Sequence, residues 1–157
     1  QFIIVDVFPR VEATGYFGDM TRTFLKGVPS APQKRLWETV AQAQAQAIQA
    51  LRPGVQLSTV HRLVENFFKS RGYVTVLTGP VPEGFFHSTG HGLGLDLHEA
   101  PRVSRNSLQK AREGLVVTIE PGLYYPGLGG VRIEDVVVVK EGGCGLLSHY
   151  PYHWHIP

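Results

Sequence analysis

The stretch His87-Ser-Thr-Gly-His-Gly-Leu-Gly-Leu-Asp-Leu-His-Glu99 combines three histidines with four small residues. The histidines are His87, His91 and His98, and the small residues among them are Ser88, Gly90, Gly92 and Gly94. Because glycine lacks a side chain, backbone and ligand can approach the same point closely. Any one of these histidines alone would more often be structural, but the stretch as a whole has the composition of a binding site.

Four carboxylates lie in segments that are otherwise apolar: Asp6, Asp19, Glu120 and Glu134. Burying a carboxylate costs several kcal/mol unless it is paired or coordinates a metal. The arginines placed to pair with them, Arg10, Arg22 and Arg132, are too few to neutralise four acids. The sequence therefore predicts a divalent metal centre.

The composition is that of an ordinary globular domain. The chain has 157 residues, of which 43% are hydrophobic and 18% charged, and we expect one domain over residues 1–157. The net charge of +2 is spread without a basic run, so neither nucleic acid nor a membrane surface is an expected partner. Cys144 is the single cysteine, which excludes an internal disulfide. The chain opens at Gln1 inside an apolar run, and we expect the natural protein to begin upstream.

Two β-hairpins are expected to carry the acids. Residues 2–12 and 19–25 are typical of strands joined by a turn, which would place Asp6 and Asp19 opposite each other on one face. Residues 115–125 and 130–140 predict a second hairpin of two long strands that bear Glu120 and Glu134. A further short strand is predicted over residues 73–78, and a loop over residues 100–106.

Two helices are expected between the hairpins. Ser30 and Gln33 form a capping-box pattern that predicts a helix ending near Leu51. The second helix is predicted from an N-cap at Ser58 to about Arg71, with His61 off its apolar face and exposed. In the tail, residues 149–155 place three histidines beside aromatic residues. A docked aromatic terminus is the preferred interpretation of this tail.

Four motifs in this order resemble the pita-bread metallopeptidases, in the branch of Xaa-Pro aminopeptidases and Xaa-Pro dipeptidases (prolidases). The motifs are Gly18-Asp-Met-Thr-Arg-Thr-Phe24, the histidine stretch quoted above, Thr118-Ile-Glu-Pro-Gly-Leu-Tyr124 and Gly130-Val-Arg-Ile-Glu-Asp135. The resemblance covers nearly the whole chain. It implies an α+β pita-bread fold, with a curved, mainly antiparallel sheet, helices on its outer face and an N-terminal part that is missing.

The resemblance implies a two-metal site with five ligands: Asp6, Asp19, His91, Glu120 and Glu134. Asp19 and Glu134 would bridge the ions, Asp6 would bind one of them, and His91 and Glu120 the other. Two divalent ions roughly 3.5–4 Å apart can hold a bridging hydroxide at neutral pH and polarise the scissile carbonyl. Oxygen-rich ligands make manganese the first expectation, with cobalt, zinc or iron as alternatives.

The resemblance also implies further roles. Glu120 would handle protons from the attacking water, and His98 would donate to the substrate carbonyl or the tetrahedral intermediate. His87 and Arg132 match positions that line the substrate pocket. For Arg132, a buried ion pair that orients a ligand such as Glu134 is the alternative interpretation.

The implied reaction is hydrolysis of the peptide bond between an N-terminal residue and proline. The substrates would be short peptides with proline at the second position, and we expect a cytoplasmic protein that forms a homodimer. The alternatives are a non-catalytic pita-bread module that binds peptides or proteins, a methionine aminopeptidase and a creatinase-like hydrolase. Asp6 is followed by Val-Phe where the family usually has Ala-Gly, and two more residues than usual separate it from Asp19.

Overall fold

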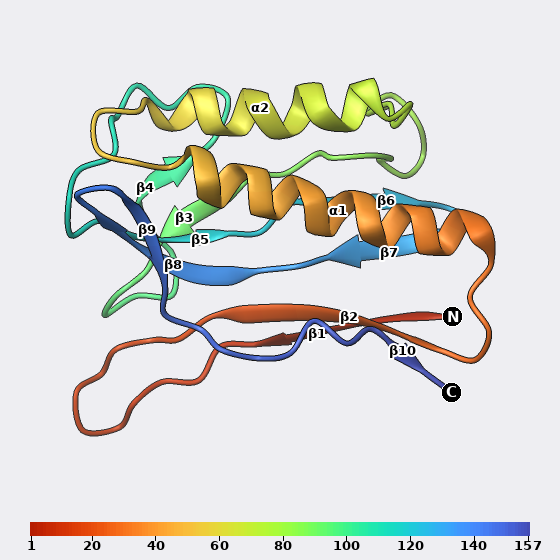
Figure 1. Ribbon diagram of the computed structural model, residues 1–157, viewed down its shortest axis with the longest axis horizontal. Coiled ribbons are helices and arrows are strands. Elements are labelled where there is room, and N and C mark those ends of the chain that lie inside the picture. The colour runs from red at the N-terminus through yellow and green to blue at the C-terminus, as the bar shows by residue number, and fades with distance from the viewer.

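The computed structural model describes residues 1–157 and shows an α+β fold in which two helices form a layer over antiparallel sheets (Figure 1). The elements follow in the order β1 (Phe2–Val7), β2 (Met20–Lys26), α1 (Ala31–Ala50), α2 (Leu57–Ser70), β3 (Gly90–Gly92), β4 (Glu99–Val103), β5 (Val116–Ile119), β6 (Gly122–Tyr125), β7 (Gly129–Arg132), β8 (Asp135–Lys140), β9 (Gly143–Leu146) and β10 (His155–Ile156). Neither helix is long and apolar enough to cross a membrane.

The core lies between the helices and the sheets. Its buried side chains include Leu36 and Val40 of α1, Val64 of α2, and Val117 and Val137 of the central strands β5 and β8. The predicted capping box of α1 is confirmed, since Ser30 accepts from the Gln33 amide and the Gln33 side chain accepts from the Ser30 amide. The helix layer therefore fixes the outer face of the sheets and leaves the opposite face to the site.

The first hairpin forms, but with a different register from the predicted one. Strands β1 and β2 pair antiparallel with Asp6 opposite Thr21 rather than opposite Asp19. Asp19 is two positions from Thr21, so both aspartates still belong to the same face of the hairpin and lie on a diagonal. The placement of Asp6 directly across from Asp19 was wrong, because the strand pairing continues to the bridge between Arg10 and Phe17.

The second hairpin is confirmed, but each of its two arms is divided into two short strands. Strand β5 pairs with β8, and β6 pairs with β7. The two arms are therefore interrupted at the same height along the hairpin, between these two pairs. One break holds Glu120 and Pro121, and the other holds Ile133 and Glu134. Proline has no backbone N–H to donate to a ladder, which accounts for the break after Glu120. The two glutamates therefore leave the ladder where their side chains can turn to one point.

Other local predictions were wrong. Residues 99–103 form strand β4 rather than a loop, because β4 is the edge partner of β3. The strand predicted for residues 73–78 is reduced to a bridge between Val76 and Glu83. Helix α2 begins at Leu57 with Gln56 at the N-cap, which provides no side-chain cap. His61 is buried rather than exposed, since its Nδ1 lies 2.9 Å from the Thr89 hydroxyl and its Nε2 lies 3.2 Å from Glu65.

The C-terminal tail docks as predicted. Trp154 stacks on Trp37 of α1 with ring centroids 5.2 Å apart, and β10 pairs in parallel with β2. Figure 1 shows the tail running beside the first hairpin, so that the two chain ends lie near each other. The tail thus extends the sheet that carries Asp19.

Gly90 allows the strand that carries His91 to approach β5. A Cβ at this position would lie 1.8 Å from the Thr118 carbonyl oxygen, a distance that requires the backbone to move. We expect Gly90→Ala to lower the free energy of unfolding by about 3 kcal/mol, the upper end for overpacking. Urea unfolding of the metal-free protein measures this change.

The matched control is Gly142→Ala, where an added Cβ would meet nothing within 4 Å. This variant is expected to unfold at the urea concentration of the parent protein. Equal stability of the two variants would contradict the close approach of β3 and β5.

Candidate metal centre

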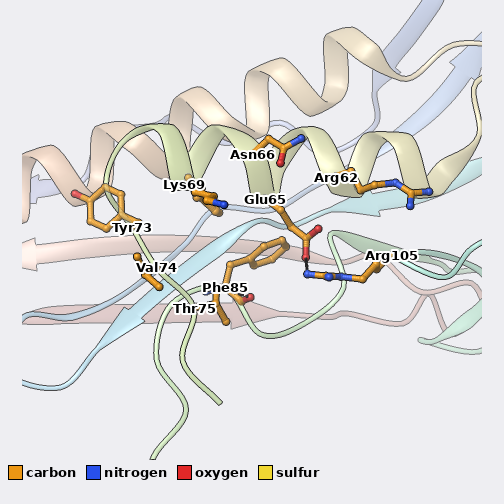
Figure 2. Close-up of a pocket in the computed structure, with 10 residues that line it drawn as sticks. Arg62, Glu65, Asn66, Lys69, Tyr73, Val74, Thr75, Phe85 and Arg105 are labelled. Atoms are coloured by element: carbon orange, nitrogen blue, oxygen red, sulfur yellow. Dashed lines mark hydrogen bonds and ion pairs between the residues drawn. The ribbon is translucent and has the colours of Figure 1, made fainter. Parts of the chain in front are cut away.

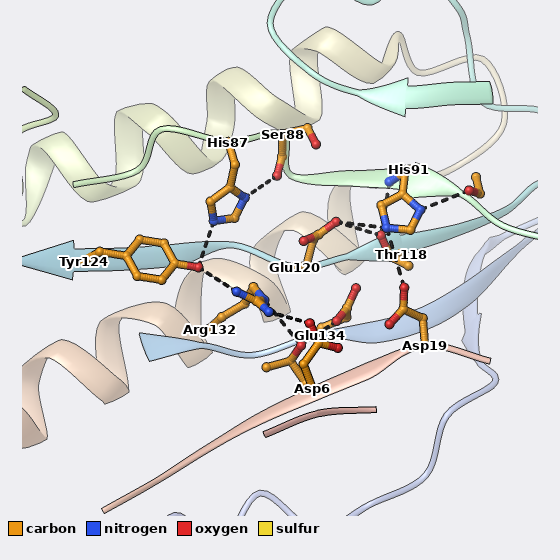
Figure 3. A network of polar contacts seen from close by, with 12 residues as sticks. Asp6, Asp19, His87, Ser88, His91, Thr118, Glu120, Tyr124, Arg132 and Glu134 are labelled. Carbon is orange, nitrogen blue, oxygen red and sulfur yellow. Dashed lines mark hydrogen bonds and ion pairs between the residues drawn. The ribbon is translucent and has the colours of Figure 1, made fainter. Parts of the chain in front are cut away.

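Side chains from distant parts of the chain converge between the first hairpin and the broken second hairpin (Figure 3). Asp19 precedes β2, His91 lies on β3 and Glu134 precedes β8, and all three are buried. One ligand atom from each of them lies within 4.8 Å of the others. The structure thus brings together three of the five predicted ligands in a group that could hold a metal ion.

Glu120 lies next to this group and contacts His91. Its Oε1 lies 3.3 Å from His91 Nε2, and Asp19 Oδ2 lies 3.6 Å from the same nitrogen. Both carboxylates therefore face the same lone pair of the imidazole ring. The fourth predicted ligand is close to the first three.

Burial and mutual repulsion make the acids hard to ionise together. Burial, reinforced by Asp6, raises the pKa of Asp19 to about 6. Burial also raises the pKa of Glu120 and of Glu134, and for Glu134 the neighbouring Glu120 and Asp19 add to the shift. Deprotonated carboxylates crowded in this way need a cation among them, so the residues fit a divalent metal.

His91 has the protonation state and orientation that a metal ligand needs. Burial, with His98 and Arg102 nearby, lowers its pKa, so the ring is neutral at pH 7. Its Nδ1 lies 3.0 Å from the Gly92 carbonyl oxygen, which can only accept, and therefore carries the proton. The lone pair is left on Nε2, the atom that faces Asp19 and Glu120.

Two threonine hydroxyls support the glutamates, and sequence reasoning missed both. Thr21 donates to Glu134 Oε2 at 2.6 Å, and Thr118 donates to Glu120 Oε1 at 3.2 Å. The Thr118 hydroxyl also accepts from the His91 amide at 3.1 Å. Such hydrogen bonds fix the direction of ligating carboxylates. The available signal was the place of both threonines inside the quoted motifs.

Asp6 lies at the edge of the group and belongs to a directed chain of hydrogen bonds. Arg132 Nη2 donates to Asp6 at 2.6 Å, and Arg132 Nη1 donates to the Tyr124 hydroxyl at 3.1 Å. His87 Nδ1 donates to the Ser88 carbonyl oxygen, which leaves Nε2 to accept from Tyr124 at 3.1 Å. Burial lowers the pKa of His87 to about 4, so this ring is neutral. Arg132 thus forms an ion pair with a predicted ligand, as the alternative interpretation allowed, but the ligand is Asp6 rather than Glu134.

A cavity of about 390 Å³ opens onto Glu120 and His91. The exposed His98 lines it, with its ring edge-to-face against that of His91 at a centroid distance of 4.4 Å. His87 and Arg132 line it as well, as expected for substrate-facing residues. Sequence reasoning did not single out Arg102 and Tyr124, which complete the polar wall. The cavity can therefore present cations and hydrogen-bond donors to a peptide beside the acids.

A second cavity lies on the outer side, between α2 and residues 73–75 (Figure 2). Its lining includes Arg62, Glu65 and Arg105, and Arg105 is paired with Glu65 at 2.6 Å. It shares no lining residue with the cavity at Glu120. The predicted site residues therefore all lie outside this second cavity.

The sequence profile of metallopeptidase family M24 matches residues 1–141. The chain belongs to this family. Its sequence is 41% identical over 133 residues to a Xaa-Pro dipeptidase of Pyrococcus furiosus, a match that covers 85% of the chain and 36% of that relative. The chain thus spans about a third of the length of the curated relatives it matches.

Solved structures of family M24 relatives confirm the pita-bread fold. The prolidase of Pyrococcus horikoshii superimposes with a TM-score of 0.86 at 37% identity, covering 96% of this chain and 40% of that one. The X-Pro aminopeptidase of Thermotoga maritima gives a TM-score of 0.87 at 34% identity, covering 99% and 42%. The α+β fold and the metallopeptidase family expected from the motifs are both confirmed.

The raised pKa of Glu134 predicts that the metal-free protein loses folding stability as the pH rises. An acid whose native pKa is raised loses stability as pH rises from its unfolded pKa toward its native pKa. The glutamine in Glu134→Gln does not ionise, so this variant keeps the stability that the parent loses as the pH rises. We expect the variant to gain stability over the parent, by at least about 1.4 kcal/mol, between about pH 5 and about pH 8.

Urea unfolding of both metal-free proteins at the two pH values measures the difference. A stability difference that stays constant with pH would contradict the raised pKa of Glu134 and with it the burial of this acid beside Glu120 and Asp19.

Proposed function

We propose that this chain is the metal-binding part of the catalytic domain of a Xaa-Pro exopeptidase, with residues 1–157 forming one domain. The observation that carries the proposal is the convergence of Asp19, His91, Glu134 and Glu120 beside a cavity lined by His98 and Arg132. The matched relatives named Xaa-Pro dipeptidase and X-Pro aminopeptidase support the choice of bond. The bond hydrolysed is the one between an N-terminal residue and proline.

The proposed ligands are the five that the motifs predicted. Asp19 and Glu134 would be shared between two ions, Asp6 would hold one of them, and His91 with Glu120 would hold the other. Asp6 is the most exposed of them and is paired with Arg132, so it would have to give up part of this pairing to hold an ion. Carboxylates and an imidazole suit manganese, with cobalt, zinc or iron as alternatives.

Two divalent ions bound there would polarise the scissile carbonyl and supply a hydroxide nucleophile at neutral pH. Glu120 is the proton carrier, because its pKa is raised by burial and its carboxylate borders the cavity. His98, which lines the cavity beside His91, donates a hydrogen bond to the substrate carbonyl. His87 and Arg132 hold the peptide, and Tyr124 fixes both of them through its hydroxyl.

A non-catalytic peptide-binding module is the competing hypothesis. All five residues of the proposed ligand set are present and four of them converge, which argues against a role without metal. The same full set argues against a metal-free creatinase-like hydrolase. The 41% identity to the Xaa-Pro dipeptidase favours the proline-specific branch over a methionine aminopeptidase. The homodimer and the cytoplasmic location stay predictions.

Peptide hydrolysis tests the function. The protein is stripped with EDTA, loaded with Mn²⁺ and incubated with Ala-Pro, Ala-Pro-Ala and Ala-Ala, and free alanine is measured by chromatography. We expect release of alanine from the proline peptides at a rate at least about tenfold above that from Ala-Ala, and loss of this activity after metal removal. Preference for Ala-Pro over Ala-Pro-Ala would define a dipeptidase, and the reverse an aminopeptidase.

Glu120→Gln is the control for the chemistry, because it keeps the size of the side chain and removes its proton-carrying carboxylate. We expect this variant to be inactive on all three peptides. Activity that survives EDTA, or equal activity on Ala-Ala, would overturn the proposal.

A further inference from the structure

Asp135, the residue after Glu134, lies at the centre of a buried cluster of donors. It is fully buried and accepts four hydrogen bonds. Arg22 and Ser148 donate to Oδ1 at 2.8 and 2.7 Å, and Gln44 and Tyr152 donate to Oδ2 at 2.8 and 2.5 Å. The donors come from β2, from α1 and from the C-terminal tail, so one carboxylate joins three separate parts of the chain.

Arg22 connects this cluster to the backbone of Glu134. Its Nη1 donates to the Glu134 carbonyl oxygen at 2.7 Å, and its Nη2 donates to Asp135 and to the Tyr150 carbonyl oxygen. The guanidinium also lies over the Tyr152 ring at 4.4 Å. The tail thus holds the arginine from two sides while the arginine holds Glu134.

The Glu134 backbone is fixed at both of its polar groups. Its amide donates to the Thr21 carbonyl oxygen at 3.0 Å, and its carbonyl oxygen accepts from Arg22. Asp135 is the adjacent residue, so its four hydrogen bonds restrain the same peptide unit. A shift of this unit would move the Glu134 carboxylate away from Thr21, Asp19 and His91.

We propose that residues 148–152 of the tail position Glu134 for metal binding, acting through Asp135 and Arg22. Ser148 and Tyr152 are positioning residues, since neither of them touches the metal group. They lie C-terminal to residues 1–141, the range matched by the family profile, so the matched motifs alone do not complete the site. The consequence for metal affinity rests on the proposed function, whereas the restraint on Glu134 does not.

The tail hydroxyls are the best places to test this positioning. Removing Arg22 or Asp135 would leave a buried charge unpaired, which by itself can unfold the protein. Tyr152→Phe removes one donor and keeps the ring over Arg22. Ser148→Ala removes the other donor, and Ser148→Thr restores a hydroxyl. Tyr125→Phe is the matched control, because the Tyr125 hydroxyl also makes one hydrogen bond, to the Val74 carbonyl oxygen, far from the cluster.

The first readout is amide hydrogen exchange of residue Glu134 in the metal-free protein. Tyr152→Phe and Ser148→Ala are expected to speed its exchange several-fold, while Tyr125→Phe and Ser148→Thr leave it at the parent rate. Unchanged exchange in both tail variants would overturn the proposal, whether or not the protein binds metal.

The second readout is Mn²⁺ affinity, followed by electron paramagnetic resonance of free Mn²⁺. We expect both tail variants to bind about tenfold more weakly, as is typical when a supporting residue of a ligand is lost, and Tyr125→Phe to bind as the parent does. Equal affinity in all variants would contradict the positioning role. Failure of the parent itself to bind Mn²⁺ would overturn the proposed function instead, and hydrogen exchange would still decide the role of the tail.

Discussion

The structure depends on one electrostatic constraint, the placing of several carboxylates in a buried space where they repel one another. Asp19, Glu120 and Glu134 all have raised pKa values, with burial as the main cause. No arginine is paired with any of these three carboxylates, since Arg22 pairs with Asp135 and Arg132 pairs with Asp6. Arg132 offsets the repulsion only in part, since it acts to lower the pKa of Asp19 and of Glu120 while burial keeps both raised. A bound divalent cation would relieve the rest.

The architecture explains how the acids reach one point despite this repulsion. The second hairpin breaks on both arms, so Glu120 and Glu134 stand outside the regular ladder while their neighbours stay hydrogen-bonded. Core packing of β5 and β8 against the helices holds both breaks in place. The first hairpin brings Asp19 from the other side (Figure 3). Threonine hydroxyls and the buried Arg22–Asp135 pair then fix the direction of the side chains. Folding elsewhere in the chain thus stabilises an arrangement that is unfavourable by itself.

Much of the fold was predictable because local signals agreed with the tertiary structure. Ser30 and Gln33 cap α1, and the apolar runs around the acids form the two hairpins. The four carboxylates could be identified as a group because acids in apolar segments need a common partner, whereas the choice of His91 among the histidines rested on the resemblance to the family. What failed depended on partners distant in sequence. His61 is buried where it contacts Thr89, 28 residues further along the chain, and residues 99–103 become a strand only beside β3.

The remaining differences concern where a side chain points and which partner it contacts. Asp6 lies on the expected face of the first hairpin, but it is opposite Thr21 rather than Asp19. The register is set by strand pairing along the whole length of the hairpin. Tyr124 and Arg102 reach the cavity through side-chain orientation, for which a single sequence has no periodic signal. The same is true of Ser148 and Tyr152, whose hydrogen bonds to Asp135 span more than ten residues of chain.

The central claim is that the crowded carboxylates form a dinuclear metal site. Elemental analysis of protein loaded with Mn²⁺ and then desalted tests it most directly, with Glu134→Ala measured in parallel. Our account predicts about two manganese ions per chain in the parent and a clear loss in the variant. A parent that retains no manganese, or a variant that retains as much as the parent, would contradict it.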